Sequence, residues 1–214
     1  MNLAETDHLL TTTRSVRKRL DLGRPVEMEV IEQCIDLSLQ APIASNEPTY
    51  HFMLVTDADK RAEVAGWYRK AFTAYAGAAA TRASTFEDRA PRLRSSAQYL
   101  ADHMHEVPVL VIPCVEGKVE GAPLAGAAST LGTILPAAWS LMLALRSRGL
   151  GSAWTTLHLV YWKEVAEALG IPDGIVQSCL LPVAYYTGDD FRPAKRIPAA
   201  QRTYYNGWDN RRES

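Results

Sequence analysis

Four parts of the chain have the hydrophobic spacing or the composition of helices, and three short stretches are almost wholly apolar. Apolar residues three to four positions apart predict a helix with one buried face, whereas a short apolar run is typical of a buried strand. The predicted helices cover about 26–40, 58–105 as a helix-rich region, 127–148 and 161–174. The predicted strands cover 50–57, 108–117 and 176–188.

The order of these elements indicates one α+β domain over residues 1–214. Helices outnumber strands, and the strands lie between helices instead of forming hairpin pairs. No internal repeat, low-complexity tract or linker interrupts the sequence. A chain of 214 residues is long enough for one substantial core, so a second domain is not required.

Residues 121–145 form a stretch without any charged side chain. Its length satisfies the rule of roughly 20 apolar residues for a membrane span. Gly126, Gly132 and Pro136, together with four hydroxyl side chains, make it a weak candidate for insertion. We favour the alternative, a helix surrounded by protein in a core or at a subunit interface.

Composition and charge point to an ordinary globular protein. Hydrophobic residues make up 47% of the chain, charged residues 22%, and the net charge is −1, which indicates neither nucleic acid nor an anionic membrane as partner. The N-terminus lacks the basic region and apolar run of a secretory signal. We therefore expect a cytoplasmic protein with reduced, mostly buried thiols at Cys34, Cys114 and Cys179.

A cluster of cations surrounds Ser15, consisting of Arg14, Arg17, Lys18 and Arg19. One interpretation is a solvated basic turn ahead of a helix. The other is an anion site, because arginines beside a hydroxyl and free backbone N–H groups suit a phosphate. Since the chain as a whole is nearly neutral, a local patch of this kind favours a small anionic ligand over a polymer.

The sequence contains no complete catalytic constellation of its own. Nucleophile-elbow, zinc-protease, phosphate-loop and dinucleotide-binding motifs are all missing. His103 and His105 are two residues apart and do not share a helix face, so we predict no metal site. The catalytic residues therefore stay unassigned, and the chemistry points to a bound cofactor.

Four segments, in this order and spacing, resemble the nitroreductase family of FMN-dependent flavoproteins. They are TRSVR (13–17), APIASNEPTYHF (41–52), LPAAWSLMLALRSRGLGSAW (135–154) and KRIP (195–198). The resemblance covers about residues 11–208. It implies a three-layer α+β sandwich with a central mixed or antiparallel sheet flanked by helices, assembled as an intertwined homodimer with FMN at the subunit interface. The uncharged stretch would be the dimer core, and residues 66–105 a variable lid.

The resemblance also implies a set of flavin contacts. The basic segment would hold the phosphate and ribityl chain, with Arg17 beside the N1/C2 carbonyl edge of the ring, where a cation stabilises reduced flavin. The 45–46 segment would meet the polar edge of the ring, and the 155–157 backbone its N5 side. The KRIP segment would return to the phosphate. The implied FMN-binding residues are Arg14, Ser15, Arg17, Ser45, Asn46, Thr155, Thr156, Leu157, Lys195 and Arg196.

The function implied is hydride transfer from NADPH or NADH through FMN to a flat electron-poor acceptor, a nitroaromatic or quinone, in a ping-pong cycle. Departures from the family motifs leave alternatives open. Thr13 stands where many relatives have an arginine, Pro48 in place of a glutamine, and Tyr50 in place of a tryptophan. The alternatives are a flavin-storage or sensor protein with little turnover, or a relative that fragments flavin or dehalogenates an aromatic.

Aromatic residues of the predicted lid have two interpretations. They could stack on the acceptor, or they could pack in the core. The residues concerned are Trp67, Tyr68, Phe72, Tyr75 and Phe86.

Overall fold

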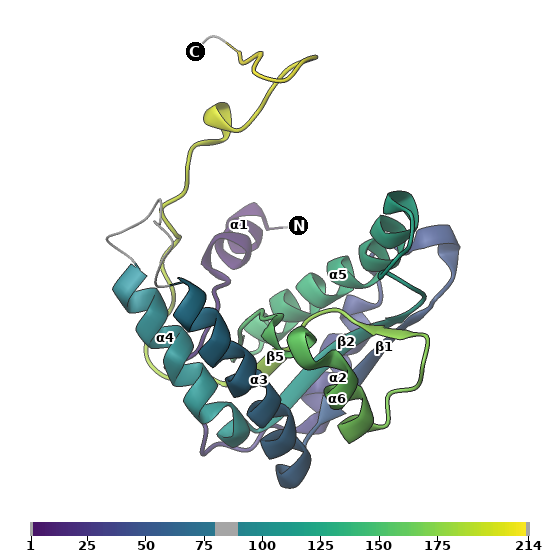
Figure 1. The fold of residues 1–214 in the computed structure, drawn as a ribbon. Helices are drawn as coiled ribbons and strands as arrows, with labels where there is room; N and C mark the ends of the chain where they lie inside the picture. Colours follow the sequence, from purple (N-terminus) through teal and green to yellow (C-terminus); the bar gives the residue numbers. More distant parts are fainter. Residues whose placement is uncertain (1, 80–89, 213–214) are drawn as a thin grey trace.

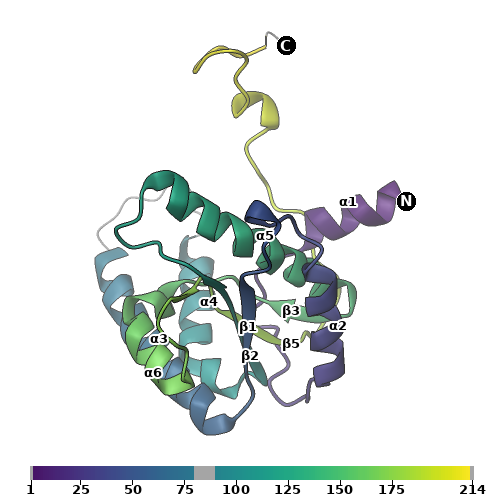
Figure 2. The same cartoon turned by 90° about the vertical axis from the view of Figure 1, so that its right-hand side faces the viewer.

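The computed structural model describes residues 2–79 and 90–212 and places an antiparallel sheet between two layers of helices (Figures 1 and 2). The strands follow the spatial order β1-β2-β5-β3, and β4 also pairs with β2. All pairings between these strands are antiparallel. The strands are β1 (Tyr50–Val55), β2 (Val109–Glu116), β3 (Leu150–Ser152), β4 (Ile175–Gln177) and β5 (Leu181–Tyr185).

Strand β2 is the centre of the sheet and is buried on both faces. Successive side chains of a strand point to opposite faces. Leu110, Ile112 and Cys114 belong to one hydrophobic cluster, whereas Val109 and Val111 belong to the other. This double burial explains the unbroken apolar run at 108–117, and it confirms the predicted three-layer α+β fold.

Each hydrophobic cluster joins the sheet to one layer of helices (Figure 2). On one face lie α3 (Ala58–Ala79), α4 (Ala90–His103) and α6 (Trp162–Leu169). On the other lie α2 (Met28–Ser38) and α5 (Leu124–Ser147). The Asp57 carboxylate caps α3 by accepting the Lys60 N–H at 3.0 Å, as expected for an aspartate ahead of a helix.

Two predicted elements have different bounds in the structure. Helix α2 covers Met28–Ser38, so it begins later and ends earlier than the predicted helix at about 26–40. The predicted strand 176–188 consists of β4 and β5, and its register on β2 shifts by one residue between them. At the junction, both the N–H and the hydroxyl of Ser178 donate to the Pro113 carbonyl. An extra residue of this kind is a β-bulge, which breaks one apolar run into two strands.

Two short elements were not predicted from the pattern. Helix α1 (Leu3–Thr12) is capped by the Asn2 side chain, which accepts the N–H groups of Ala4 and Glu5. Thr12 is its one buried residue, so it has no apolar stripe that a periodicity could reveal. Strand β3 has three residues and follows directly on α5, too short for a pattern of its own.

Most of the uncharged stretch lies in helix α5, and the two halves of this helix differ. By length and composition alone, α5 could cross a membrane. Its C-terminal half is buried on α2 and the sheet, with Ala138, Leu141 and Leu145 at 0% exposure. Its N-terminal turns are mostly exposed, and Leu124 is 88% exposed. Burial by the chain's own core is therefore confirmed for the second half, while the first half lies uncovered in the single protomer.

Candidate functional site

The basic segment lies along the edge of the sheet. Val16 donates its N–H to the Ser152 carbonyl at 2.8 Å, and Ser15 forms a parallel bridge with Ser152. Val16 and Leu20 are 3% and 5% exposed and pack into the core. This arrangement extends the sheet beyond β3 and holds the intervening cations in place. The segment is therefore docked on the sheet through Val16 and Leu20, while Lys18 stays exposed in a turn, and the anion site remains a prediction.

A glycine permits this close approach. A Cβ at Gly151 would lie 3.0–3.1 Å from three side-chain atoms of Val16. Contacts that short require the neighbour to move, and Val16 is buried. Gly151 thus has a steric role on this strand: its lack of a side chain lets Val16 dock against β3.

We expect Gly151→Ala to destabilise the protein by about 1–3 kcal/mol, the usual effect of overpacking a core contact. Urea unfolding measures this, and Gly66→Ala is the control, because nothing lies within 4 Å of a Cβ at that exposed helix position. The control should be neutral or slightly stabilising. If Gly151→Ala and Gly66→Ala had the same free energy of unfolding, the Val16 side chain would be able to move away from the added methyl group without loss of stability.

Three segments far apart in the sequence converge near Arg17. The Thr155 hydroxyl donates to the Tyr68 hydroxyl at 3.2 Å, and the Arg17 guanidinium is close enough for its charge to act on Tyr68. Burial lowers the pKa of Arg17, an effect that the neighbouring Tyr68 opposes. The structure thus brings together Arg17 and Thr155, two of the implied flavin contacts, through a tyrosine of α3.

The arginines of this site lack anionic partners. Arg14 and Arg17 are half-buried, and within the described ranges neither forms an ion pair with a carboxylate. A half-buried cation without a counterion is unfavourable unless a ligand supplies one. With the exposed Ser15 hydroxyl between them, these two residues fit a phosphate and an electron-rich ring edge. The residues present are thus compatible with FMN.

The other two cations of the cluster have structural partners. The Lys18 ammonium donates to the Ser95 hydroxyl of α4 at 2.7 Å. Arg19 donates through Nε to the Thr187 carbonyl at 2.6 Å and through Nη2 to the Asp189 carbonyl, and its guanidinium lies 4.2 Å from the centre of the Phe191 ring. The cluster therefore divides into one pair without carboxylate partners among the described residues and one pair that fastens neighbouring segments.

The loop after β3 offers fewer backbone donors than expected. The Thr155 N–H donates to the Leu180 carbonyl at 3.1 Å, and the Leu180 N–H returns a bond of 2.8 Å to Thr155. Within the described chain, no hydrogen bond engages the N–H of Thr156 or Leu157. Those two N–H groups are the ones that a ligand could meet.

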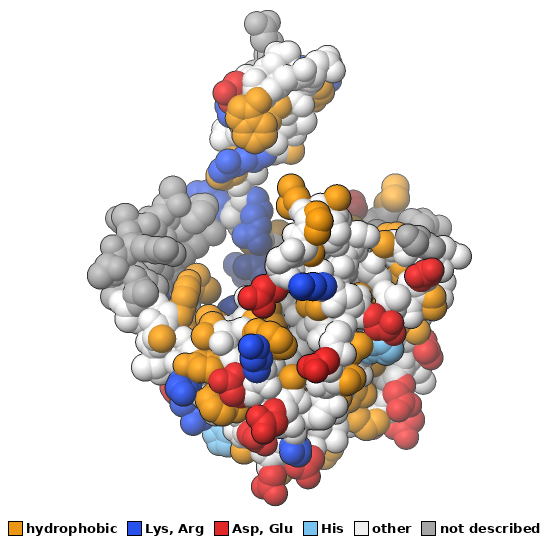
Figure 3. All heavy atoms as spheres, turned by 45° about the vertical axis from the view of Figure 1, so that its right-hand side comes forward, with side chains coloured by type: hydrophobic (Ala, Val, Ile, Leu, Met, Phe, Trp, Pro, Cys, Tyr) orange, Lys and Arg blue, Asp and Glu red, His pale blue; other side chains and the backbone are white. Residues whose placement is uncertain are grey.

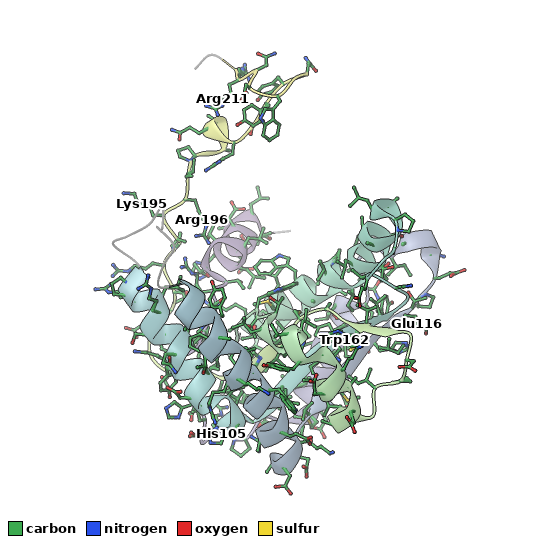
Figure 4. The ribbon with its side chains drawn as sticks, viewed as in Figure 1. His105, Glu116, Trp162, Lys195, Arg196 and Arg211 are labelled. Atoms are coloured by element: carbon green, nitrogen blue, oxygen red, sulfur yellow. The ribbon has the colours of Figure 1, made fainter. Side chains whose placement is uncertain are left out.

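The remaining implied contacts lie on other parts of the protomer. Asn46 is exposed in the short helix η1 (Ala44–Asn46), at a left-handed φ of 56°, and the Ser45 side chain lies outside the described structure. The Ala44 N–H donates to the Thr133 hydroxyl at 3.3 Å, which places η1 beside α5. Lys195 and Arg196 are exposed on the segment that leads away from the body (Figure 4). No described contact joins these residues to Arg17.

A buried histidine near this loop was not predicted. His158 follows Leu157 in the short helix η4 (Leu157–Tyr161), is 0% exposed, and neither ring nitrogen has a hydrogen-bond partner within the described structure. Burial lowers the pKa of His158 to about 4. The ring is therefore neutral at physiological pH, and no sequence signal distinguishes it from an exposed histidine.

We expect His158 to weaken the fold in acid. Below the reference pKa of 6.5 the unfolded chain binds a proton that the folded protein binds only near pH 4, so stability is lost as pH falls through this range. The loss attributable to this residue is about 2–3 kcal/mol between pH 7.5 and 4.5. Urea unfolding of wild type and His158→Leu at both pH values measures it.

The difference in free energy of unfolding between wild type and His158→Leu should change by about 2–3 kcal/mol between the two pH values, because all other titrating groups are common to both proteins. His105→Gln, a substitution at an exposed histidine, should follow the wild type. A difference that does not vary with pH would contradict a neutral His158.

The lid aromatics of α3 mostly pack within the protein. Tyr68 and Phe72 are 3% and 6% exposed in the core cluster, and the half-buried Trp67 lies 5.2 Å from the Tyr161 ring. Tyr75 is 55% exposed, and Phe86 lies outside the described residues. For Tyr68 and Phe72 the packing interpretation is the correct one.

The three thiols are buried, and the described residues contain no cluster of metal-ligating side chains. Cys34, Cys114 and Cys179 are free and buried, as predicted. Burial raises the pKa of Cys114 and of Cys179 to about 12, which keeps both thiols protonated and unreactive. Among residues 2–79 and 90–212, no group of three or more histidine, cysteine, aspartate or glutamate side chains could hold a metal ion.

A shallow apolar cavity lies away from the basic segment. Its volume is about 200 Å³, and it lies beside β1 and the loop between α6 and β4. His51 is the one strongly polar side chain in its lining, and no residue of the basic segment contributes. Geometry and charge therefore identify the site around Arg17 better than the cavity does.

Comparisons with known proteins agree with this architecture. Residues 10–185 match the model of the Nitroreductase family. A protein of Archaeoglobus fulgidus, provisionally named an NADH dehydrogenase/NAD(P)H nitroreductase, is 24% identical over 195 residues, which cover 86% of this chain and 92% of that protein.

Two solved structures show the same fold at low identity. An iodotyrosine deiodinase bound to FMN and 3-iodo-L-tyrosine has a TM-score of 0.71 at 18% identity, covering 94% of this chain and 98% of that one. The FMN-dependent nitroreductase NfnB of Mycobacterium smegmatis, in complex with NADPH, has a TM-score of 0.69 at 18% identity, covering 96% and 100%.

Proposed function

The chain belongs to the nitroreductase family, and on this premise we propose that it is an FMN-dependent oxidoreductase of the cytoplasm. In this proposal a hydride passes from NADPH or NADH through the flavin to a small, flat, electron-poor acceptor, a nitroaromatic or a quinone. The observation that carries it is the half-buried pair Arg14 and Arg17, which is docked on the sheet edge and has no carboxylate partner among the residues that the structure describes. When bound, FMN would supply the redox chemistry, because the chain offers no catalytic constellation of its own.

The protein's own residues bind and orient in this proposal. Arg14 and the Ser15 hydroxyl are suited to the phosphate and ribityl chain, since a guanidinium and a hydroxyl both donate to phosphate oxygens. Arg17 is suited to the carbonyl edge of the ring, where negative charge accumulates on reduction. Thr156 and Leu157 contribute backbone donors near the same place. Two structures of similar fold contain FMN or NADPH, which supports this assignment by analogy.

We propose that the working unit is a homodimer with FMN bound between the subunits. The exposed N-terminal half of α5 is an uncharged surface of mostly small residues, and such a surface is costly in water. Arg17 lies beside β3, whereas Asn46 lies in η1 beside Thr133 of α5. A second protomer packed along α5 would allow both groups to serve one ligand.

The C-terminal arm supports the same assembly. Residues 187–190 are still held to the body by Arg19 and Arg146, and beyond Phe191 the C-terminal arm runs away from it, as Figures 1 and 3 show. The Tyr204 and Trp208 rings stack at 4.7 Å, and Arg211 donates to the Tyr204 hydroxyl at 3.0 Å. Trp208 is still 83% exposed, so an ordered aromatic surface is left for a partner.

Figure 3 also shows lysine and arginine side chains gathered where the arm leaves the body. Lys195 and Arg196 lie on this part of the arm. A positive surface at that place suits the phosphate that the KRIP segment is expected to bind.

Purification with added FMN tests the function. We expect a yellow protein whose flavin absorbance bleaches when NADPH or NADH is added without oxygen. Kinetics with both nicotinamides and a panel of nitroaromatics, quinones and halogenated aromatics would then identify the donor and the acceptor class. Protein that stays colourless after incubation with FMN would overturn the proposal.

A flavin-storage function is the second candidate, and one contact favours it. The Thr13 hydroxyl donates to the Leu9 carbonyl at 2.6 Å, so it is engaged by α1 and does not replace the arginine found in many relatives. Weaker phosphate binding would suit a protein that releases flavin. Bound flavin that stays oxidised at millimolar NADPH and NADH would favour storage over catalysis.

A further inference from the structure

The Tyr68 hydroxyl is the point where three parts of the proposed site meet. Tyr68 lies on α3, Thr155 follows β3, and Arg17 belongs to the basic segment. The Thr155 hydroxyl donates to Tyr68 at 3.2 Å, and the charge of Arg17 acts on the same phenol.

The ring and the hydroxyl of Tyr68 have different roles. The residue is 3% exposed, and its ring packs in the cluster that contains Val64, Phe72 and Leu100. A phenylalanine could fill the same space, so packing alone does not call for an oxygen there. A buried hydroxyl is costly unless it is hydrogen-bonded. The bond from Thr155 uses the Tyr68 oxygen as acceptor and leaves the phenol's own O–H able to donate.

The phenol keeps its proton in this environment. Burial raises the pKa of Tyr68, and the Thr155 hydrogen bond and the charge of Arg17 only partly oppose this effect. The O–H is therefore a donor throughout the physiological range. Next to Arg17, which forms no ion pair within the described part of the chain, a neutral donor adds to the attraction for a negatively charged or carbonyl-bearing ligand.

We propose that Tyr68 is a positioning residue of the flavin site: its hydroxyl holds the Thr155 side chain beside Arg17 and leaves an O–H to hydrogen-bond the ligand that Arg17 binds. The inference rests on the proposed function. It gives α3 a role beyond covering the sheet, because the helix then sets the distance between the basic segment and the loop after β3. The basic segment and the loop after β3 must keep a fixed distance if a bound ring is to contact both in one orientation.

Three single variants and one double variant test the proposal. Tyr68→Phe removes the hydroxyl and keeps the ring, and Thr155→Val removes the partner hydroxyl and keeps the side-chain shape. Tyr75→Phe is the matched control on the same helix, because Tyr75 is 55% exposed and lies outside this network. For each protein, FMN affinity is measured by fluorescence quenching, the flavin midpoint potential by anaerobic titration, and the apo-protein stability by urea unfolding.

We expect Tyr68→Phe to bind FMN about three- to tenfold more weakly, the usual range for one neutral hydrogen bond. Its bound flavin should have a more negative midpoint potential, since a donor to the reduced ring is lost. Thr155→Val should change both quantities in the same direction, and the double variant should do little more than either single one. Tyr75→Phe should match the wild type.

An unchanged affinity and potential in Tyr68→Phe would overturn the inference and leave the proposed function standing. So would a loss of apo-protein stability with an unchanged potential, because that result assigns Tyr68 to packing alone. Wild-type protein that binds no FMN would overturn the proposed function and this inference together.

Discussion

Arg17→Ala should weaken FMN binding about ten- to a hundredfold, the effect of losing one charge-assisted hydrogen bond of about 1.5–3 kcal/mol. The bound flavin should also be harder to reduce, because a half-buried cation near the ring stabilises the negative charge that reduction brings. A contact to the phosphate alone would change affinity without changing the potential. Equilibrium binding and an anaerobic redox titration of the same variant separate these two roles.

Lys18→Ala is the matched control within the same basic cluster. Lys18 is exposed, and its ammonium donates to Ser95 of α4 instead of standing unpaired. Exposed charges are screened by salt, so this variant should bind and reduce FMN nearly as the wild type does. If both variants lost affinity equally, the cluster would act through its net charge. Unchanged affinity and potential in Arg17→Ala would remove Arg17 from the site.

Ala128→Glu should convert the proposed dimer into a folded monomer and weaken FMN binding with it. Ala128 is exposed on the uncovered half of α5, so a glutamate there does not disturb the protomer. In a dimer built along α5 the new carboxylate would be buried without a partner. A penalty of about 3 kcal/mol or more would weaken association at least about a hundredfold. Sedimentation velocity measures the mass, and circular dichroism checks that the helices persist.

A glutamate on α5 tests dimer formation only at a position that is exposed in the single protomer. Ala138 lies at the middle of the same helix, but it is 0% exposed within the protomer's own core. A glutamate there would unfold the subunit and say nothing about assembly. Ala62→Glu, at an exposed position on α3, is the control for adding a charge to a helix and should leave mass and FMN binding unchanged. A stable, FMN-loaded monomer of the wild type at micromolar concentration would contradict the shared site.

The local pattern of hydrophobic and polar residues predicted most of the helices and strands that form the three layers. The strand at 108–117 was predictable because β2 is buried on both faces, and double burial leaves an unbroken apolar run. Helix α3 was predictable from Asp57, because a helix start depends on a cap a few residues away. The one-residue register shift between β4 and β5 was not predictable from the sequence. A bulge depends on which residues of β2 each of these strands pairs with.

The order of four motifs in the sequence indicated the family and identified the basic segment as a candidate site. It did not show which cations of that segment have structural partners and which do not. Arg17 and Arg19 are two residues apart in one cluster, yet Arg19 is held by the 187–189 backbone while Arg17 has no carboxylate partner within the described ranges. Such a distinction depends on segments more than a hundred residues away. Likewise, nothing near Tyr68 in the sequence shows that its hydroxyl meets Thr155.

Helix α5 shows most clearly what could be predicted from the sequence and what depends on the tertiary structure. The absence of charge over residues 121–145 predicted from sequence a helix surrounded by protein, because apolar surface is driven out of water whatever lies nearby. Only the tertiary structure decided that α2 and the sheet cover its second half and that its first half is left exposed. The physical reason is that burial is a property of what packs against a residue, and packing partners are brought together by the fold.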